Sequence, residues 1–185
     1  ITGIAATGSG HPLAFPETAS CAVYKSTLYQ ATSGEACKER ALPGGSAQDL
    51  SDANGGTAPE DCGIVLHHED RLWLMNKSDA PHVVFASAVG DATNWDTTDP
   101  TDGGAYTNTG SEGGVVGEPI VAGISHNGVL YFGGPTSVYV VQGNPKVSGC
   151  RRIGFNIGPV MNTAWCVGPD GYVYMITPDG LYRTG

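Results

Sequence analysis

Apolar residues in this chain occur in short runs that are separated by turn-forming residues. The clearest series lies between Pro119 and Gly143. Pro119–His126 is an apolar run, Asn127-Gly128 is a strong β-hairpin signal, and Val129–Phe132 is the return strand. After a second turn, Ser137–Gln142 runs back. We therefore predict three antiparallel strands in series.

Two of these predicted strands are apolar at consecutive positions rather than at alternate ones. They are Val129–Phe132 and Val138–Val141. Successive side chains of a strand point to opposite faces of its sheet, so both faces of this sheet need to be covered. The pattern predicts a small antiparallel unit that is stacked between copies of itself.

The same pattern occurs four times along the chain. Each unit has an apolar strand, a tight polar turn and then an aliphatic–aromatic pair, which we call the anchor pair. The anchor pairs are Leu28-Tyr29, Leu72-Trp73, Leu130-Tyr131 and Val173-Tyr174, and they are spaced by 44, 58 and 43 residues. Degenerate repeats of roughly 40 to 50 residues that are built as meanders are typical of β-propeller blades.

We therefore predict an all-β fold, a β-propeller-like array of about four antiparallel meander blades. The array is either a small complete propeller or part of a larger one. A β-sandwich is the alternative, because any hairpin-rich chain produces some apparent period. The abundance of turn residues (28 Gly and 12 Pro) and the lack of a sustained 3.6-residue period favour short strands over helices.

The predicted domain organisation is a single β-propeller domain or fragment over residues 1–185. Its repeat units span approximately residues 19–62, 63–117, 118–160 and 161–185. Residues 32–62 and 96–117 are expected to be long loops, the first with or without a helical turn, and residues 144–159 are expected to be a linker. Before residue 18, only Ile1–Ala6 is predicted as a strand. The chain starts at Ile1 without an initiator Met, so we expect a processed product or part of a longer protein.

The net charge of −9 is unevenly distributed. Residues 35–118 carry 15 acidic and 4 basic side chains. This balance argues against nucleic-acid binding through phosphates, which needs clustered Lys and Arg. No apolar run approaches the roughly 18 residues of a membrane span, so we expect a soluble protein without a membrane partner.

The five cysteines are Cys21, Cys37, Cys62, Cys150 and Cys166. The absence of a CxxC pair argues against a zinc site. Cys37 and Cys62 bracket a predicted loop. They either close it as a disulfide, if the protein matures in an oxidising compartment, or remain free thiols.

Two groups of side chains resemble metal ligands. The first is His67-His68 with His82 and Glu69-Asp70 nearby, but adjacent strand residues point to opposite faces, so His67 and His68 are not expected to share one ion. The second group is four aspartates in a Gly-rich stretch, namely Asp91, Asp96, Asp99 and Asp102. Clustered oxygens suit calcium, but the spacing matches neither the EF-hand nor the Gly-rich nonapeptide, so we expect a solvated loop.

No nucleophile, zinc-protease or phosphate-loop motif is present in the sequence. Asp170 and Asp179 each lie in a Pro-Asp-Gly turn, where Asp caps the turn and Gly accepts positive φ. Trp73, Trp95 and Trp165 are a possible sugar-stacking surface, but we expect most of them in the core between sheets. We therefore predict no enzyme, and no catalytic, cofactor-binding or metal-binding residues.

From Ile64 onward the order of elements resembles the β-propeller proteins of tailed-bacteriophage virions, the tail-tube nozzle type and its relatives. The segments that carry the resemblance are Arg71–Leu74, Val83–Ser87, Gly90-Asp91, Asn94-Trp95, Leu130–Phe132, Ser137–Pro145, Ile157-Gly158, Trp165-Cys166, Asp170–Tyr174 and Asp179–Arg183. The region over which these segments are spread, from Ile64 to Arg183, covers about two-thirds of the chain. The insert at residues 32–62 and the cysteine count depart from the family pattern.

The resemblance implies a structural role without catalytic residues. Copies would form a homo-oligomeric ring in the tail nozzle, tube or neck, in contact with other virion tail proteins, after assembly in the host cytoplasm. DNA would pass through without specific binding, which the acidic balance suits. The alternative is a secreted or surface β-propeller that binds glycan or protein ligands. A hydrolytic propeller, with carboxylates that converge on the central channel, is a third possibility.

Overall fold

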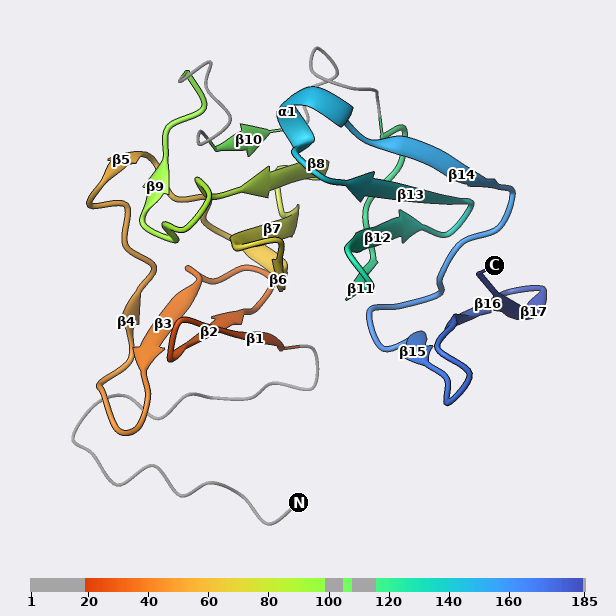
Figure 1. Cartoon of the computed structure of the whole chain (residues 1–185), viewed down its shortest axis with the longest axis horizontal. Coiled ribbons are helices and arrows are strands. Elements are labelled where there is room, and N and C mark those ends of the chain that lie inside the picture. Colours follow the sequence, from red (N-terminus) through yellow and green to blue (C-terminus); the bar gives the residue numbers. More distant parts are fainter. Residues whose placement is uncertain (1–18, 99–104, 108–115, 185) are drawn as a thin grey trace.

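The computed structural model describes residues 19–98, 105–107 and 116–184, and almost every element in it is a short β-strand (Figure 1). Four small antiparallel sheets follow one another along the chain. We call them sheets I to IV. The predicted all-β class is confirmed.

Sheets I and II have four strands each, in the orders β1-β2-β3-β4 and β6-β7-β8-β10. Sheet I contains β1 (Ser20–Tyr24), β2 (Thr27–Ala31), β3 (Lys38–Ala41) and β4 (Gln48–Asp49). Sheet II contains β6 (Cys62–His68), β7 (Arg71–Lys77), β8 (Ala80–Ala86) and β10 (Tyr106–Thr107). A short parallel pair is formed by β5 (Gly55–Gly56) and β9 (Asn94–Trp95).

Sheet III also has four strands, whereas sheet IV has three. Sheet III contains β11 (Ala122–His126), β12 (Val129–Gly134), β13 (Ser137–Gln142) and β14 (Arg151–Phe155), with the short helix α1 (Pro145–Ser148) before β14. Sheet IV contains β15 (Trp165–Val167), β16 (Val173–Thr177) and β17 (Gly180–Arg183). Each anchor pair lies on the second strand of its sheet.

The predicted hairpin at Asn127-Gly128 is confirmed. Both residues have positive φ, 49° and 71°, as a type I′ turn requires. The β1–β2 and β6–β7 turns also have positive φ at both central residues, although neither contains Gly. In the β6–β7 turn these residues are Glu69 and Asp70, at 47° and 58°. The geometry of the hairpin therefore overrides the preference of these non-glycine residues for negative φ.

Two segments that were predicted as irregular contain strands. The expected loop at residues 32–62 includes β3, β4 and β5, and the expected linker at residues 144–159 includes α1 and β14. Both β3 and β14 are rich in charged side chains, which hid them from an apolar pattern. They are strands because they continue the backbone hydrogen-bond ladder from β2 and β13 toward the outer side of their sheets.

In the expected loop at residues 96–117, the structure places β10 at Tyr106–Thr107. Tyr106 is almost fully buried and pairs with Ala86 of β8. Residues 99–104 and 108–115 lie outside the described residues, as does the predicted strand Ile1–Ala6.

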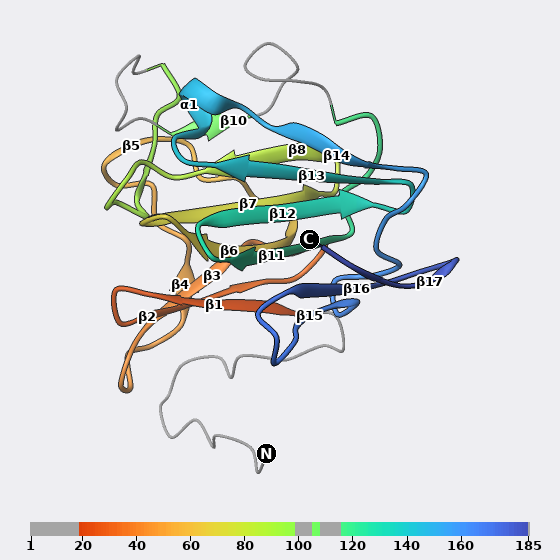
Figure 2. The ribbon, with the colours of Figure 1, turned by 45° about the vertical axis from the view of Figure 1, so that its right-hand side comes forward.

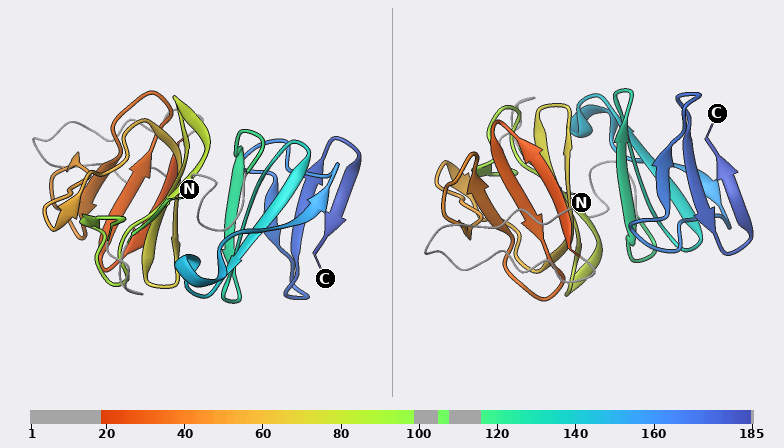
Figure 3. Two further views of the ribbon diagram at one scale, coloured as in Figure 1. Left: turned by 90° about the horizontal axis from the view of Figure 1, so that it is seen from above. Right: turned by 90° about the horizontal axis from the view of Figure 1, so that it is seen from below.

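The sheets stack face to face in a row, with sheets I and IV at its two ends (Figures 1 and 3). Strands in the four sheets run along similar directions (Figure 2). The first strand of each sheet contacts the first strand of the next, so β1, β6, β11 and β15 form the inner side of the row. Apolar clusters fill the space between neighbouring sheets.

In sheets II and III, the anchor pair divides between the two neighbouring sheets. Leu72 is buried in the cluster shared with sheet I, and Trp73 in the cluster shared with sheet III. Leu130 faces sheet II, and Tyr131 packs toward sheet IV. The first anchor residue thus faces the preceding sheet and the second faces the following one, which confirms that both faces of the Pro119–Gly143 unit are covered.

Trp73 is the largest fully buried side chain at the centre of this row. Its Nε1 donates to the His68 carbonyl at 3.1 Å, and its ring lies 6.3 Å from that of Tyr106. We expect Trp73→Ala to lower the free energy of unfolding by about 3 to 5 kcal/mol, because it leaves a cavity between sheets II and III. Urea unfolding followed by circular dichroism measures this change.

The matched control is Val147→Ala in α1, where the side chain is 79% exposed. Its effect should stay within about 0.5 kcal/mol. Equal effects of the two substitutions would contradict the placement of Trp73 in the core.

Candidate functional site: two exposed end faces

The histidines that were considered as metal ligands lie on opposite faces of sheet II, as expected. The His67 ring stacks on Tyr24 of sheet I, with ring centroids 4.7 Å apart. His68 Nδ1 lies 2.9 Å from Ser125 Oγ of sheet III. In the part of the chain that the structure describes, no group of three or more His, Cys, Asp or Glu side chains is arranged to hold a metal ion. These histidines connect neighbouring sheets.

Asp91 and Asp96 lie between β8 and β10 and bind within their own turns, and Asp91 Oδ2 also accepts a hydrogen bond from Asn54 Nδ2 at 2.7 Å. Asp91 Oδ1 accepts hydrogen bonds from the Thr93 backbone N–H at 2.9 Å and from Thr93 Oγ1 at 2.7 Å. Asp96 makes the equivalent pair of contacts with Thr98. Asp99 and Asp102 lie outside the described residues. The two described aspartates therefore cap turns.

The three tryptophans are core residues, as expected. Trp73, Trp95 and Trp165 are all buried, each in a cluster between two sheets. The expected turn chemistry of Asp170 is also confirmed, because its Oδ1 accepts from the Tyr172 N–H and Gly171 has a φ of 80°. None of these side chains forms an open aromatic platform.

All five cysteines are free thiols. Cys37 and Cys62 are buried side by side between sheets I and II, where their thiols share a hydrogen bond that lowers the pKa of Cys37 and raises that of Cys62. Cys150 is also buried, whereas Cys21 and Cys166 are exposed. Of the two alternatives from the sequence, the structure shows the free thiols.

A groove of about 480 Å³ opens between sheets III and IV. Its walls are largely apolar, with Val138 and Ile153 on one side and Met175 and Tyr182 on the other. Arg151 and Arg183 also line it. Sheet III has a fourth strand, β14, whereas sheet IV ends at β17 among the described residues, so the groove lies beside the outer part of sheet III.

The outer face of sheet IV is exposed and largely apolar. Val173 and Met175 point inward to the cluster shared with sheet III, so the alternate residues Tyr174 and Ile176 point outward. Strand register places further side chains on the same face. We call this surface the IV end face; it consists of Cys166, Tyr174, Ile176, Leu181 and Arg183. Ile176 is 55% exposed and Leu181 is 68% exposed.

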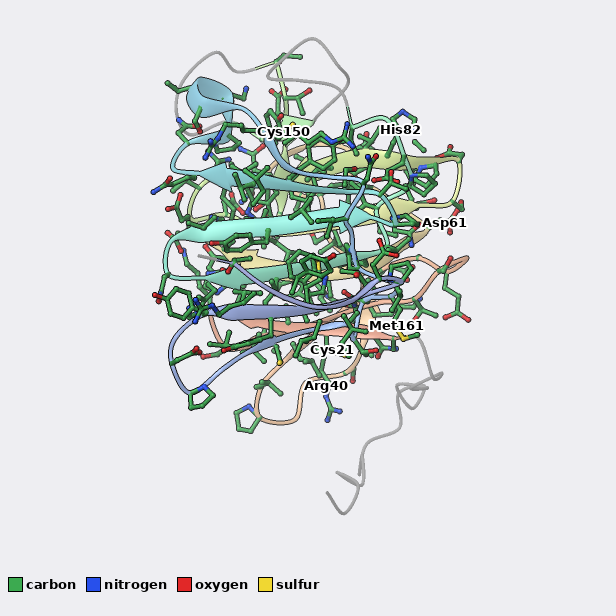
Figure 4. The ribbon with its side chains drawn as sticks, turned by 90° about the vertical axis from the view of Figure 1, so that its right-hand side faces the viewer. Cys21, Arg40, Asp61, His82, Cys150 and Met161 are labelled. Atoms are coloured by element: carbon green, nitrogen blue, oxygen red, sulfur yellow. The ribbon has the colours of Figure 1, made fainter. Side chains whose placement is uncertain are left out.

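The outer face of sheet I is the counterpart at the other end of the row. Tyr24 and Tyr29 point inward to sheet II, so the alternate residues point outward. We call this surface the I end face; by register it consists of Cys21, Val23, Leu28, Gln30, Lys38 and Arg40, of which Gln30 is buried at 6% exposure. Val23 is 55% exposed. Two residues of the I end face, Cys21 and Arg40, are labelled in Figure 4, which is viewed from the sheet IV side.

The two end faces differ from every other sheet face because no neighbouring sheet covers them among the described residues. Leu28 is the first residue of its anchor pair and faces the side where a preceding sheet would lie. Tyr174 is the second residue of its pair and faces the side where a following sheet would lie. Each end face therefore has the side chains of one partner in an inter-sheet contact, without the other partner. The two end faces are thus the best candidates for an interaction surface. Sequence reasoning had not singled out either end face.

Comparison with known proteins supports the fold and leaves function open. No family model and no curated protein matches the chain. The computationally designed Ika4 protein matches with a TM-score of 0.53 and 13% identity over 90% of each chain. A Saccharomyces cerevisiae structure of Dbp5 bound to Nup159, Gle1, IP6 and ADP matches with a TM-score of 0.46 and 12% identity, over 90% of this chain and 42% of that one. No helix of the described residues is long and apolar enough to cross a membrane.

The free state of Cys37 and Cys62 can be checked directly. The protein is unfolded in guanidinium with an alkylating reagent and without reductant, then digested and mapped by mass spectrometry. We expect both cysteines in separately alkylated peptides, because each retains its thiol. A peptide pair joined through Cys37 and Cys62 would overturn this assignment.

His68 should make stability depend on pH. Burial lowers its pKa below the ordinary 6.5, although Glu69, with Oε2 at 4.0 Å from Nε2, opposes this shift. The unfolded chain therefore binds the proton more readily, and stability is lost as pH falls through about 6.5 toward the lower folded pKa. We expect the urea midpoint to fall between about pH 7.5 and about pH 5.5.

The His68→Gln variant should lose part of this pH dependence, whereas His82→Gln, at an exposed site on β8, should retain it. Urea titrations of the three proteins across this pH range provide the comparison. A pH dependence in His68→Gln as steep as in the parent protein would show that other groups cause it.

Proposed function

We propose that this chain is a non-catalytic structural protein whose sheets are consecutive blades of a β-propeller and whose end faces build it into a larger assembly. The observation that carries the proposal is the exposure of apolar side chains on both end faces, at positions equivalent to those of the buried inter-sheet contacts. Val23, Ile176 and Leu181 are all more than half exposed. Terminal repeats of a stacked array that acts alone normally present a polar outer face.

The propeller assignment rests on three features of the row. Its sheets are meanders whose strand order follows the sequence, their first strands are neighbours on one side, and each anchor pair serves two interfaces. Radial repetition of such meanders is the construction principle of propellers. The match to the designed Ika4 protein over 90% of both chains is in keeping with this arrangement.

The particular role that we propose is that of a tailed-phage virion protein, part of a tail nozzle, tube or neck ring through which the genome is conducted. The order of sequence elements from Ile64 onward supports it. Other tail proteins would be its partners, and DNA would pass without specific binding. The net charge of −9 suits such a conduit, because a strongly basic lumen would hold the phosphates.

A second candidate function is a secreted or surface propeller that binds a glycan or a protein. The groove between sheets III and IV favours it, because the groove combines the rings of Tyr131 and Tyr182 with Arg151 and Arg183. Aromatic rings next to cationic donors can bind both a sugar face and its polar substituents.

The virion proposal is tested on phage particles purified from the source of this chain. An antibody raised against the chain is visualised with gold in negative-stain micrographs. We expect label at the tail or neck, at positions related by the ring symmetry of the particle, and no label after the antibody has been pre-absorbed with the protein. Unlabelled tails would contradict the proposal.

A glycan array separates the second candidate from the first. Binding that is lost in Tyr182→Ala, together with unlabelled tails, would favour the ligand-binding propeller over the virion protein.

A further inference from the structure

We propose that the IV end face of one copy packs against the I end face of a second copy, and that two copies close head-to-tail into an eight-bladed ring. This inference rests on the proposed function only in treating the end faces as assembly surfaces. It does not depend on the phage assignment.

The first argument is the direction of the anchor pairs. In sheets II and III, the first anchor residue always faces the preceding sheet and the second always faces the following sheet. In sheet I, Tyr29 faces sheet II, so Leu28 faces a side on which the described residues place no sheet. In sheet IV, Val173 faces sheet III, so Tyr174 likewise faces a side without a sheet among the described residues. The I end face is built to contact the outer face of a preceding sheet, and the IV end face is such an outer face. The IV end face of a second copy can therefore cover the I end face, and the I end face of that copy can cover the IV end face.

The second argument comes from equivalent positions on the first strands. We align the sheets on their anchor pairs. The residues paired with the second anchor residue are Ala22, Leu66, Ile124 and Cys166. The residues one position earlier on each first strand are Cys21, Val65, Gly123 and Trp165.

At each internal interface, a member of the first set lies in the same cluster as the member of the second set from the next sheet, or close to it. Ala22 packs in the same cluster as Val65, and Ile124 packs in the same cluster as Trp165. Between sheets II and III, a Cβ on Gly123 would lie 2.7 Å from Leu66 Cδ1. Continuing this rule past sheet IV brings Cys166 of one copy against Cys21 of the second copy.

The third argument concerns closure. A head-to-tail contact generates either a closed ring or an open filament. Two copies of four sheets make eight blades, which lies within the range of about four to eight blades that propellers adopt, whereas a third copy would exceed it. A ring of two copies also covers all four end faces.

The decisive experiment uses the two exposed thiols as reporters. The full chain, purified in reductant and then desalted, is treated with diamide. Two thiols then form one disulfide, and their two protons and two electrons reduce diamide to its hydrazine. We expect a covalent dimer on a non-reducing gel and a peptide pair that joins Cys21 to Cys166.

Variants at the cysteines decide between contact geometries. Cys21→Ser and Cys166→Ser should each abolish the Cys21–Cys166 peptide. Cys150→Ser is the matched control, because Cys150 is buried within one copy and its loss should leave the cross-link unchanged. Links between two Cys21 residues or between two Cys166 residues would overturn the head-to-tail arrangement.

Native mass spectrometry and light scattering test the ring without oxidation. We expect a mass of two 19.0 kDa chains. Ile176→Glu and Leu181→Glu should each raise the dimer dissociation constant by about 100-fold or more, because a carboxylate is then buried in an apolar interface at both contacts of the ring. Val147→Glu, which places the same charge on the exposed side of α1, should leave it unchanged.

A monomer at all soluble concentrations, without cross-links, would overturn the proposal, and a ladder of higher cross-linked species would overturn closure by two copies. These failures are distinct from failure of the proposed function. A cross-linked two-copy ring with unlabelled phage tails would refute only the virion role. Labelled tails with a monomer that does not cross-link would refute only the two-copy ring.

Discussion

Face-to-face contact between neighbouring sheets is the interaction on which this structure depends. A small sheet that is apolar on both faces cannot bury its surface alone, so its strands are stabilised by packing against neighbouring sheets. Leu72 and Trp73 show how the sequence encodes this requirement. Adjacent in the chain, they point to different neighbours, so one dipeptide fixes the place of its sheet within the row.

Apolar packing alone would leave the sheets free to slide, and buried polar contacts prevent this. Ser20 Oγ of sheet I exchanges hydrogen bonds with the backbone of Val65, 3.1 Å from both its N–H and its carbonyl oxygen. On the other side of sheet II, His68 reaches Ser125. The hydrophobic effect is non-directional, whereas these bonds are satisfied in only one register. The polar residues between the sheets therefore determine alignment.

The inner strands could be predicted from the sequence, whereas the outer strands of sheets I and III could not. The anchor pairs, the Asn127-Gly128 hairpin and the buried tryptophans follow from apolar periodicity and turn chemistry, both of which are local. Strands β3 and β14 were missed because their charged residues break the apolar pattern, and only the hydrogen bonds to the neighbouring strand make them extended. The candidate site was missed for a related reason. Leu28 and Tyr174 belong to the same repeat as the buried anchor residues, and only the position of their sheets at the ends of the row leaves them uncovered.

Gly123 has a geometric consequence for the whole row. It lies on the inner side, where the first strands of sheets II and III meet, and it has no side chain to hold them apart. The angle between two neighbouring sheets depends on how closely their inner edges approach each other compared with their outer edges. The missing side chain at this position thus contributes to the curvature of the row. A larger residue there would open the inner edge, flatten the arc and increase the number of layers needed to complete a full turn.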